Sequence, residues 1–261
     1  MTDRWSDLAA RLGSALLMVL VGVWAIWVGG VVFYVVVALV CGLMIWELVR
    51  MLAPDMPGLA VQLGGVACFA LLLTSYLPVL FSAPLLAAPA FVGFSQLRQN
   101  RLLYAVFTLL VLSAGFGMMH VRVDLGFGWL VWLVLIVVVT DVAGYFAGRT
   151  LGGPKFWPRV SPKKTWSGTV AGWLGAAVVG AFFAVNSGAW VAVLLASVVL
   201  SFASQLGDIA ESAIKRKTGV KDSSALIPGH GGVLDRFDGM LGASIGFLLI
   251  EVLFGFPWGP Q

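Results

Sequence analysis

Charged residues are scarce in this chain of 261 residues: they make up 11% of the sequence, whereas hydrophobic residues make up 60%. Soluble globular domains carry about a quarter charged residues. Together with a mean hydropathy of +1.00, this scarcity excludes a soluble enzyme, a nucleic-acid-binding domain and a disordered chain. Five runs contain no Asp, Glu, Lys or Arg, namely 12–46, 56–97, 102–121, 125–140 and 165–207. Because a helix needs about 20 apolar residues to cross a bilayer, these runs predict a polytopic integral membrane protein.

Cysteine is almost absent as well. Cys41 and Cys68 are the two in the chain, and both lie in apolar runs, where a thiol behaves as a small hydrophobic residue. A disulfide-stapled secreted module is therefore excluded, and neither cysteine indicates a metal site. The runs also lack the period-2 alternation of a membrane barrel, so the predicted fold class is all-α, a bundle of transmembrane helices. The first run is too long for a signal-peptide core, so we expect an uncleaved first span.

Helix breakers divide the apolar runs into about nine transmembrane helices. Gly29-Gly30 separates the first span from the second, Pro78 the third from the fourth, and residues 186–188 the seventh from the eighth. The predicted spans are 12–28, 31–48, 59–76, 79–96, 102–119, 129–148, 168–186, 188–206 and 239–256. Eight spans stay possible, because three prolines interrupt the stretch 56–97.

The basic residues predict the orientation of these spans. With the N-terminus in the cytoplasm, Arg122 is the one basic residue of sixteen that falls in an outside segment. The inside segments hold Arg4, Arg11, Arg50, Arg98, Arg101, Arg149, Lys155, Arg159, Lys163, Lys164, Lys215, Arg216, Lys217, Lys221 and Arg236. So strong a positive-inside bias predicts a cytoplasmic N-terminus.

Polar residues are concentrated in two segments, the predicted cytoplasmic loops 149–167 and 207–238. We therefore expect two regions: residues 129–261 would carry the chemistry, and residues 1–128 would supply packing, a lipid groove or dimer contacts. Asp141 lies inside the sixth span, where a charge costs about 2.5–3.5 kcal/mol and is usually functional or paired. No ionisable residue lies deep in any span of the N-terminal half.

The second loop contains carboxylates with the spacing of one helix face. Asp208 and Glu211 are three residues apart, and so are Asp235 and Asp238. Clustered carboxylate oxygens near a membrane surface suit Mg²⁺, which binds through a few carboxylates, water and substrate phosphate. Basic residues for such phosphates are Lys215, Arg216, Lys217 and Lys221, and the glycines 229, 231 and 232 permit close backbone approach. The alternative is that these are solvated residues at helix ends.

Two further features leave their roles open. Ser161, Lys163, Lys164 and Thr165 precede the seventh span, where lysines and hydroxyls can hold an anion near a helix N-terminus or contact anionic lipid. His230 is a base, a metal ligand or a phosphate contact, although its glycine-rich surroundings favour a constraint on backbone geometry.

The second loop also resembles a known signature. It reads Ser212-x-x-Lys215-Arg216-x₄-Lys221-Asp222 and then Ile227-Pro228-Gly229-His230-Gly231-Gly232-x-x-Asp235-Arg236-x-Asp238. These 27 residues resemble the signature of the CDP-diacylglycerol synthases, or phosphatidate cytidylyltransferases, and the similarity extends over residues 141–238. One departure is Ser167, at a position where the family often has Glu.

The resemblance implies transfer of the cytidylyl group of CTP to phosphatidate, with release of pyrophosphate, at the cytoplasmic surface of a bacterial plasma (inner) membrane. It implies Mg²⁺, and a second cation, Mg²⁺ or K⁺. The implied metal ligands are Asp141, Asp208, Asp235 and Asp238, and the implied catalytic residues are Asp208, Asp235, Asp238 and Lys221. The implied substrate-binding residues are Ser161, Lys163, Lys164, Thr165, Ser212, Lys215, Arg216, Asp222, His230, Gly231, Gly232 and Arg236.

Three other classes of protein are alternatives to a CDP-diacylglycerol synthase. A CDP-alcohol phosphotransferase also uses carboxylates three apart, but it needs further aspartates in the next helix, which here holds only Glu251. An ion-coupled transporter would place Asp141 and Asp208 near the bilayer midplane, often in repeated halves. A structural membrane subunit would have no reason to concentrate carboxylates and lysines. A homodimer is plausible, because 32 glycines permit close helix contacts.

Overall fold

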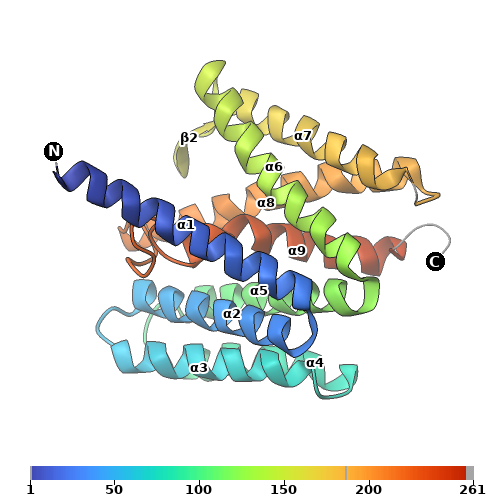
Figure 1. Ribbon diagram of the computed structural model, residues 1–261. Coiled ribbons are helices and arrows are strands. Elements are labelled where there is room, and N and C mark those ends of the chain that lie inside the picture. The colour runs from blue at the N-terminus through green and yellow to red at the C-terminus, as the bar shows by residue number, and fades with distance from the viewer. Residues whose placement is uncertain (1, 186, 257–261) are drawn as a thin grey trace. The chain divides into compact units, whose positions relative to one another are not determined.

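The chain folds into helices of the length that a bilayer requires (Figure 1). The computed structural model describes residues 2–185 and 187–256, with side chains from residue 11 onward. Within these ranges, nine helical segments are long and apolar enough to cross a membrane. They are α1 (Thr2–Val28), α2 (Gly30–Leu52), α3 (Pro57–Thr74), α4 (Ser82–Gln96), α5 (Arg101–His120), α6 (Phe127–Thr150), α7 (Trp166–Ala184), α8 (Trp190–Thr218) and α9 (Leu234–Phe254). The predicted all-α membrane fold with nine spans is confirmed, and the alternative of eight is not supported.

The predicted loop 207–238 is partly helical. Helix α8 continues to Thr218, beyond the predicted end at 206, and α9 begins at Leu234, before the predicted start at 239. Hydropathy marks where lipid contact ends, whereas Ala, Glu, Lys and Arg after residue 206 are good helix formers that continue the helix into a polar environment. Asp208, Glu211, Ser212 and Lys215 therefore lie on a helix. Residue 186, in the predicted turn 186–188, lies outside the described residues.

The predicted loop 149–167 contains a small hairpin that the sequence did not indicate. Strand β1 (Lys155–Trp157) pairs antiparallel with β2 (Ser161–Thr165), with Trp157 opposite Ser161 and Lys155 opposite Thr165. Thr165 ends the strand and also caps α7, since its hydroxyl accepts a hydrogen bond from the backbone N–H of Gly168 at 3.2 Å. The hairpin thereby fixes Lys163 and Lys164 at the start of α7.

The structure divides into two units by its contacts. The first unit comprises Met1–Val123 and Lys217–Phe237, and the second comprises Asp124–Arg216 and Asp238–Gln261. The segment 217–237 of the signature therefore packs with the N-terminal helices. The division by role at residue 128 remains a prediction.

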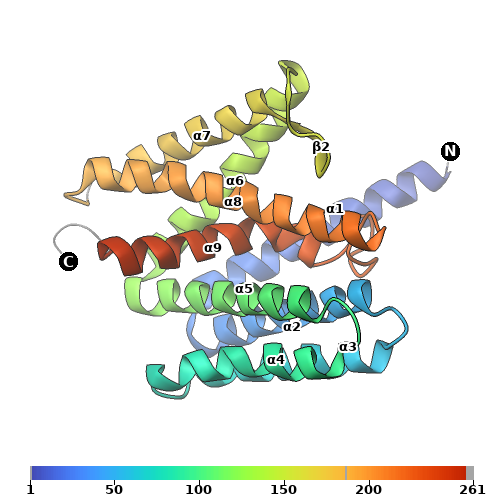
Figure 2. The same ribbon diagram turned by 180° about the vertical axis from the view of Figure 1, so that it is seen from behind.

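In the first unit, α2, α3, α4 and α5 form a bundle in which each helix packs on the next (Figures 1 and 2). Helices α2 and α3 approach closely at Gly42 and Gly64, where a Cβ on either glycine would lie within 3 Å of the other's carbonyl oxygen. Small residues allow such contacts, which replace the hydrophobic driving force that lipid does not provide. Arg122 follows α5 and donates hydrogen bonds to the carbonyl oxygens of Ile26 (2.9 Å) and Trp27 (3.4 Å), at the end of α1.

In the second unit, α6 packs against α7 near the hairpin, and α8 lies beside α9 (Figure 2). Buried hydrogen bonds join α6 to α8, from the indole of Trp132 to Ser197 (3.0 Å) and from Thr140 to Ser201 (2.7 Å). Helices α8 and α9 are in close contact at Gly207 and Gly242, because a Cβ on Gly207 would lie 2.9 Å from the backbone nitrogen of Gly242. This packing fixes the helix ends that carry Asp141, Asp208 and Asp238.

Candidate functional site

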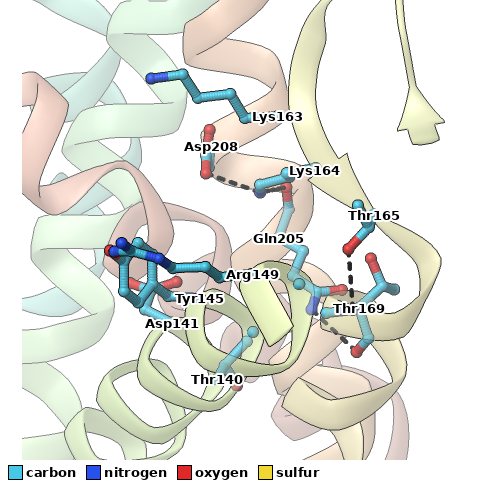
Figure 3. Close-up of a pocket in the computed structure, with 13 residues that line it drawn as sticks. Thr140, Asp141, Tyr145, Arg149, Lys163, Lys164, Thr165, Thr169, Gln205 and Asp208 are labelled. Carbon is cyan, nitrogen blue, oxygen red and sulfur yellow. Dashed lines mark hydrogen bonds and ion pairs between the residues drawn. The ribbon is translucent and has the colours of Figure 1, made fainter. Parts of the chain in front are cut away.

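The second unit contains a pocket whose lining includes two of the predicted carboxylates, Asp141 and Asp208, and two of the predicted lysines, Lys163 and Lys164. Its cavity volume is about 390 Å³, and it lies among α6, β2, α7 and α8 (Figure 3). The lining residues are Thr140, Asp141, Gly144, Tyr145, Gly148, Arg149, Lys163, Lys164, Thr165, Gly168, Thr169, Gln205 and Asp208. Both charge signs are present, so the pocket offers cations for an anionic ligand and oxygen ligands for a metal.

Lys164 and Asp208 form the central ion pair of the pocket, with Nζ 2.7 Å from Oδ2 (Figure 3). Lys164 also donates to the backbone carbonyl oxygen of Gln205 at 3.2 Å. The other carboxylate oxygen of Asp208 accepts a hydrogen bond from the Ser212 hydroxyl at 3.2 Å. The hairpin and α8, which are far apart in the sequence, are thus joined by one lysine.

Asp141, Asp208 and Asp238 gather in this unit. Asp238 lies close enough to Asp208, Asp141 and Lys164 to interact electrostatically with all three. The Asp141 carboxylate lies beside Gly239, where a Cβ would be 3.8 Å from Oδ2. Among the described residues, no three His, Cys, Asp or Glu side chains are grouped closely enough to hold a metal ion by themselves. The donor chemistry nevertheless suits Mg²⁺, which uses one or two carboxylates and takes its remaining ligands from water and substrate phosphate.

Helix α6 contributes a stripe of residues with a spacing of four. Asp141, Tyr145 and Arg149 follow one another along the same face of the helix, as Figure 3 shows. Arg149 donates to the Tyr145 hydroxyl at 2.6 Å and lies over the ring of the same residue. Neither Tyr145 nor Arg149 is assigned a role from the sequence, although both follow Asp141 at helical spacing, by four and by eight residues.

Gln205 is a further pocket residue that the sequence analysis missed. Its side chain is buried, accepting a hydrogen bond from the Trp173 indole (3.2 Å) and donating to the carbonyl oxygen of Thr169 (3.2 Å). An uncharged residue in an apolar run carries no sequence signal of this kind. Its two contacts fix the wall of the pocket between α7 and α8.

Two predicted site residues, Lys215 and Thr165, make contacts within the second unit itself. The ammonium of Lys215 is 2.5 Å from Glu211, whose side chain is fully buried. The Thr165 hydroxyl caps α7 and lies 3.0 Å from the hydroxyl of Ser167. Ser167, in the position where a Glu is common, donates to the backbone oxygen of Gly152. This serine therefore supports the hairpin and supplies no carboxylate.

Seven further predicted residues lie in the first unit, on the segment after α8 and in the first turn of α9, namely Lys221, Asp222, His230, Gly231, Gly232, Asp235 and Arg236. Ser161, Arg216 and Asp238 belong to the second unit but do not line the pocket. The Asp235 carboxylate accepts hydrogen bonds through Oδ2 from the backbone and hydroxyl of Ser223, both 2.9 Å, and from the backbone of Gly232, 2.7 Å. His230 Nδ1 lies 2.8 Å from the Ser14 hydroxyl, and its backbone oxygen accepts from Arg236 at 2.9 Å. Lys221 and Asp222 are exposed. Gly231 has a φ of +79°, which requires glycine.

The first unit also contains a buried carboxylate that the sequence analysis did not single out. Glu47 lies near the end of α2, where an acidic residue reads as a solvated end residue, yet its side chain is fully buried. Glu47 and Arg50 are the two charged residues near the end of this helix, and their spacing gives no sign that Glu47 is buried.

The sequence places the chain in a known family of membrane enzymes. A profile of the Cytidylyltransferase family matches residues 9–254, and the chain belongs to this family. A phosphatidate cytidylyltransferase of Brucella suis biovar 1 is 37% identical to it over 272 residues, which cover 98% of this chain and 97% of the relative. A phosphatidate cytidylyltransferase of Helicobacter pylori (strain 26695) is 41% identical over 133 residues, half of each chain.

These findings decide between the classes that the sequence left open. They confirm the predicted resemblance to the phosphatidate cytidylyltransferases. They give no support to a CDP-alcohol phosphotransferase, to an ion-coupled transporter or to a structural subunit. The roles of the individual site residues remain predictions.

Proposed function

We propose that this chain transfers the cytidylyl group of CTP to phosphatidate, which gives CDP-diacylglycerol and pyrophosphate. Family membership supports the reaction. The observation that carries the assignment of the site is the pocket of the second unit, in which Lys163, Lys164 and Arg149 stand beside Asp141 and Asp208. Such a pocket matches a reaction between two polyphosphate- or phosphate-bearing substrates, because both need cations around them.

The lipid phosphate attacks the α-phosphorus of CTP in line. A bond forms between a lipid phosphate oxygen and that phosphorus, and the bond between the α-phosphorus and its bridging oxygen to the β-phosphate breaks. A phosphate monoester loses its second proton near a pH of about 6, so the attacking oxygen needs no general base at neutral pH. The protein's part is therefore to place two anionic substrates side by side and to offset their repulsion.

Lysine and arginine side chains meet that need in the pocket. Lys163 and Arg149 are exposed to the cavity and neutralise phosphate charge, while Lys164 keeps Asp208 in place through their 2.7 Å ion pair. Arg149 is oriented by its hydrogen bond to Tyr145. Oriented cations of this kind stabilise the charge that develops on the departing pyrophosphate.

Asp141, Asp208 and Asp238 are the residues that would hold Mg²⁺ in this unit. When bound, Mg²⁺ would neutralise phosphate charge and orient the leaving group. Asp235 and a second cation, Mg²⁺ or K⁺, belong to the same proposal on the strength of the family signature. Three carboxylates close to one another also need cationic partners, and Lys164 is the one that contacts Asp208.

We place the enzyme in a bacterial plasma membrane with its site on the cytoplasmic side. The positive-inside distribution supports this orientation, because the basic residues of the pocket fall in the segments assigned to the cytoplasm. CTP is a polar triphosphate that does not cross a bilayer unaided, so a cytoplasmic site gives it direct access.

The test is pyrophosphate release by the purified protein in detergent, given CTP, phosphatidate and Mg²⁺. We expect release only when all three are present, and a fall of about 100-fold or more in kcat for Asp238→Asn. Asp55→Asn is the matched control, because Asp55 is exposed in the turn between α2 and α3. No pyrophosphate from the wild-type protein refutes the reaction, and full activity of Asp238→Asn refutes the site.

A further inference from the structure

Glu47 is bound entirely by the segment that joins α8 to α9. Its Oε1 accepts hydrogen bonds from the Ser224 hydroxyl (2.6 Å) and the backbone N–H of Val233 (2.8 Å). Its Oε2 accepts from the Ser223 hydroxyl (3.0 Å) and the backbone N–H of Leu234 (2.7 Å). An ionised carboxylate offers about four acceptor sites, so these four donors match its capacity.

These contacts are tertiary, and they satisfy a local need of α9. The first N–H groups of any helix lack an intrahelical acceptor, and burying them without a partner is costly. Here a side chain of α2 supplies the acceptors, since Val233 and Leu234 stand at the start of α9. A negative charge in that place also interacts favourably with the helix dipole.

Ser223 links Glu47 to Asp235. Its hydroxyl, which has one proton to donate, lies 3.0 Å from Oε2 of Glu47 and 2.9 Å from Oδ2 of Asp235, so the two carboxylates share a single donor. Asp235 Oδ2 is held in addition by the backbone N–H groups of Ser223 and Gly232. The orientation of the Asp235 carboxylate therefore depends on the position of Ser223, which in turn depends on Glu47.

We propose that Glu47 is a positioning residue for the cytidylyl transfer: it holds the segment 221–236 in its active conformation and, through Ser223, orients Asp235. The proposal deepens the proposed function and rests on it. The segment carries Lys221, His230, Asp235 and Arg236, which the family signature assigns to the reaction. Glu47 accepts hydrogen bonds from four donors, and this function explains why a chain with so few charged residues has a carboxylate in the interior of its N-terminal bundle.

Glu47→Gln is the most direct perturbation, because it keeps the size of the side chain. The serine hydroxyls can turn round and accept a hydrogen bond, but a backbone N–H cannot. Whichever way the amide points, its NH₂ group faces the N–H of Val233 or of Leu234. Loss of a charge-assisted hydrogen bond there predicts a fall of about tenfold or more in kcat. Asp55→Asn, at an exposed position in the turn between α2 and α3, is the control and should keep wild-type kinetics.

Two measurements separate positioning from a general loss of stability. Amide hydrogen exchange at Val233 and Leu234 should accelerate about tenfold or more in Glu47→Gln, with exchange in α3 and α4 unchanged. Ser223→Ala and Glu47→Gln should have non-additive effects on kcat, because both act through the same hydrogen bonds. Glu47→Gln and Asp55→Asn should combine additively.

The outcomes decide the proposal. A folded Glu47→Gln protein with wild-type kcat, or additive effects with Ser223→Ala, overturns it. If Glu47→Gln fails to fold, Ser224→Ala removes one donor only, and wild-type kcat in that variant overturns the proposal as well, whereas a severalfold fall with faster exchange at Val233 supports it. An inactive wild-type protein would overturn the proposed reaction alone, because hydrogen exchange tests the role of Glu47 without turnover.

Discussion

Gly207 precedes Asp208 and lies where α8 and α9 are in closest contact. Replacing it by alanine places a Cβ 2.9 Å from the backbone nitrogen of Gly242 and nearer still to the carbonyl oxygen of Asp238, whereas ordinary contacts begin at 3.4 Å. Both neighbours are backbone atoms, which cannot move aside by changing a rotamer. The two helices must therefore separate by about 1 Å in Gly207→Ala, as overpacked sites do.

The size of the effect follows from two opposing contributions. Alanine in a helix is favoured over glycine by about 1 kcal/mol, whereas overpacking costs about 1–3 kcal/mol and here acts on backbone. The displacement separates Asp208 on α8 from Asp238 on α9, and an error of about 1 Å in a catalytic arrangement costs about 100-fold in rate. We expect Gly207→Ala to lose about 100-fold in kcat, measured as pyrophosphate release, and to unfold at a lower Tm in detergent.

Gly65→Ala in α3 is the control for glycine replacement as such. No atom lies within 4 Å of a Cβ built on Gly65, so this substitution should leave kcat unchanged and should not lower Tm. Wild-type kcat in Gly207→Ala would refute the conclusion that the close contact of α8 with α9 sets the distance between the two aspartates.

Three further predictions concern charge. Lys164→Gln should lower kcat about 100-fold, because it leaves Asp208 without the ammonium 2.7 Å away, whereas Lys155→Gln, at an exposed strand position, should have wild-type kinetics. Arg122→Gln should lower the free energy of unfolding by about 1–3 kcal/mol at unchanged kcat, since it removes the donor to Ile26 near the end of α1; a change in kcat instead would contradict a purely structural role. Chelation by EDTA should abolish pyrophosphate release and added Mg²⁺ should restore it, and activity that persists in EDTA would contradict the proposed metal.

The fold could be predicted from the sequence because the bilayer imposes a strong constraint. Each charge-free run had to become one or more helices of fixed length, and the breakers placed their ends within a few residues. The prediction of secondary structure failed outside the bilayer, where contact with lipid no longer determines which segments are helical. Helix α8 runs on to Thr218 and the hairpin β1–β2 forms in the polar segment, and both depend on local packing and hydrogen bonds.

The pocket residues that the sequence predicted are mostly charged, and Thr165 is the uncharged one among them. Asp141, Lys164 and Asp208 line the pocket, as the sequence indicated. They could be found because a charged residue in or beside a transmembrane segment is costly and is usually functional or paired. Gln205 lines the same pocket and carries no such signal, since an amide among apolar residues is read as a packing residue. Tyr145 and Arg149 could have been found from their spacing of four and eight from Asp141.

A carboxylate can serve two different purposes in this fold, and only its three-dimensional contacts separate them. Asp208 presents Oδ2 to Lys164 and Oδ1 to the Ser212 hydroxyl at the wall of the cavity in which we propose that phosphate and metal bind. Oδ2 of Asp235 accepts hydrogen bonds from three donors of its own segment, and the two oxygens of Glu47 accept hydrogen bonds from four donors of that same segment. A buried backbone N–H group has no water to serve as its acceptor, so Glu47 and Asp235 both hold the segment 221–236 in place. Replacing either should therefore change hydrogen exchange in the segment 221–236, whereas replacing Asp208 should change turnover and leave that exchange as it is.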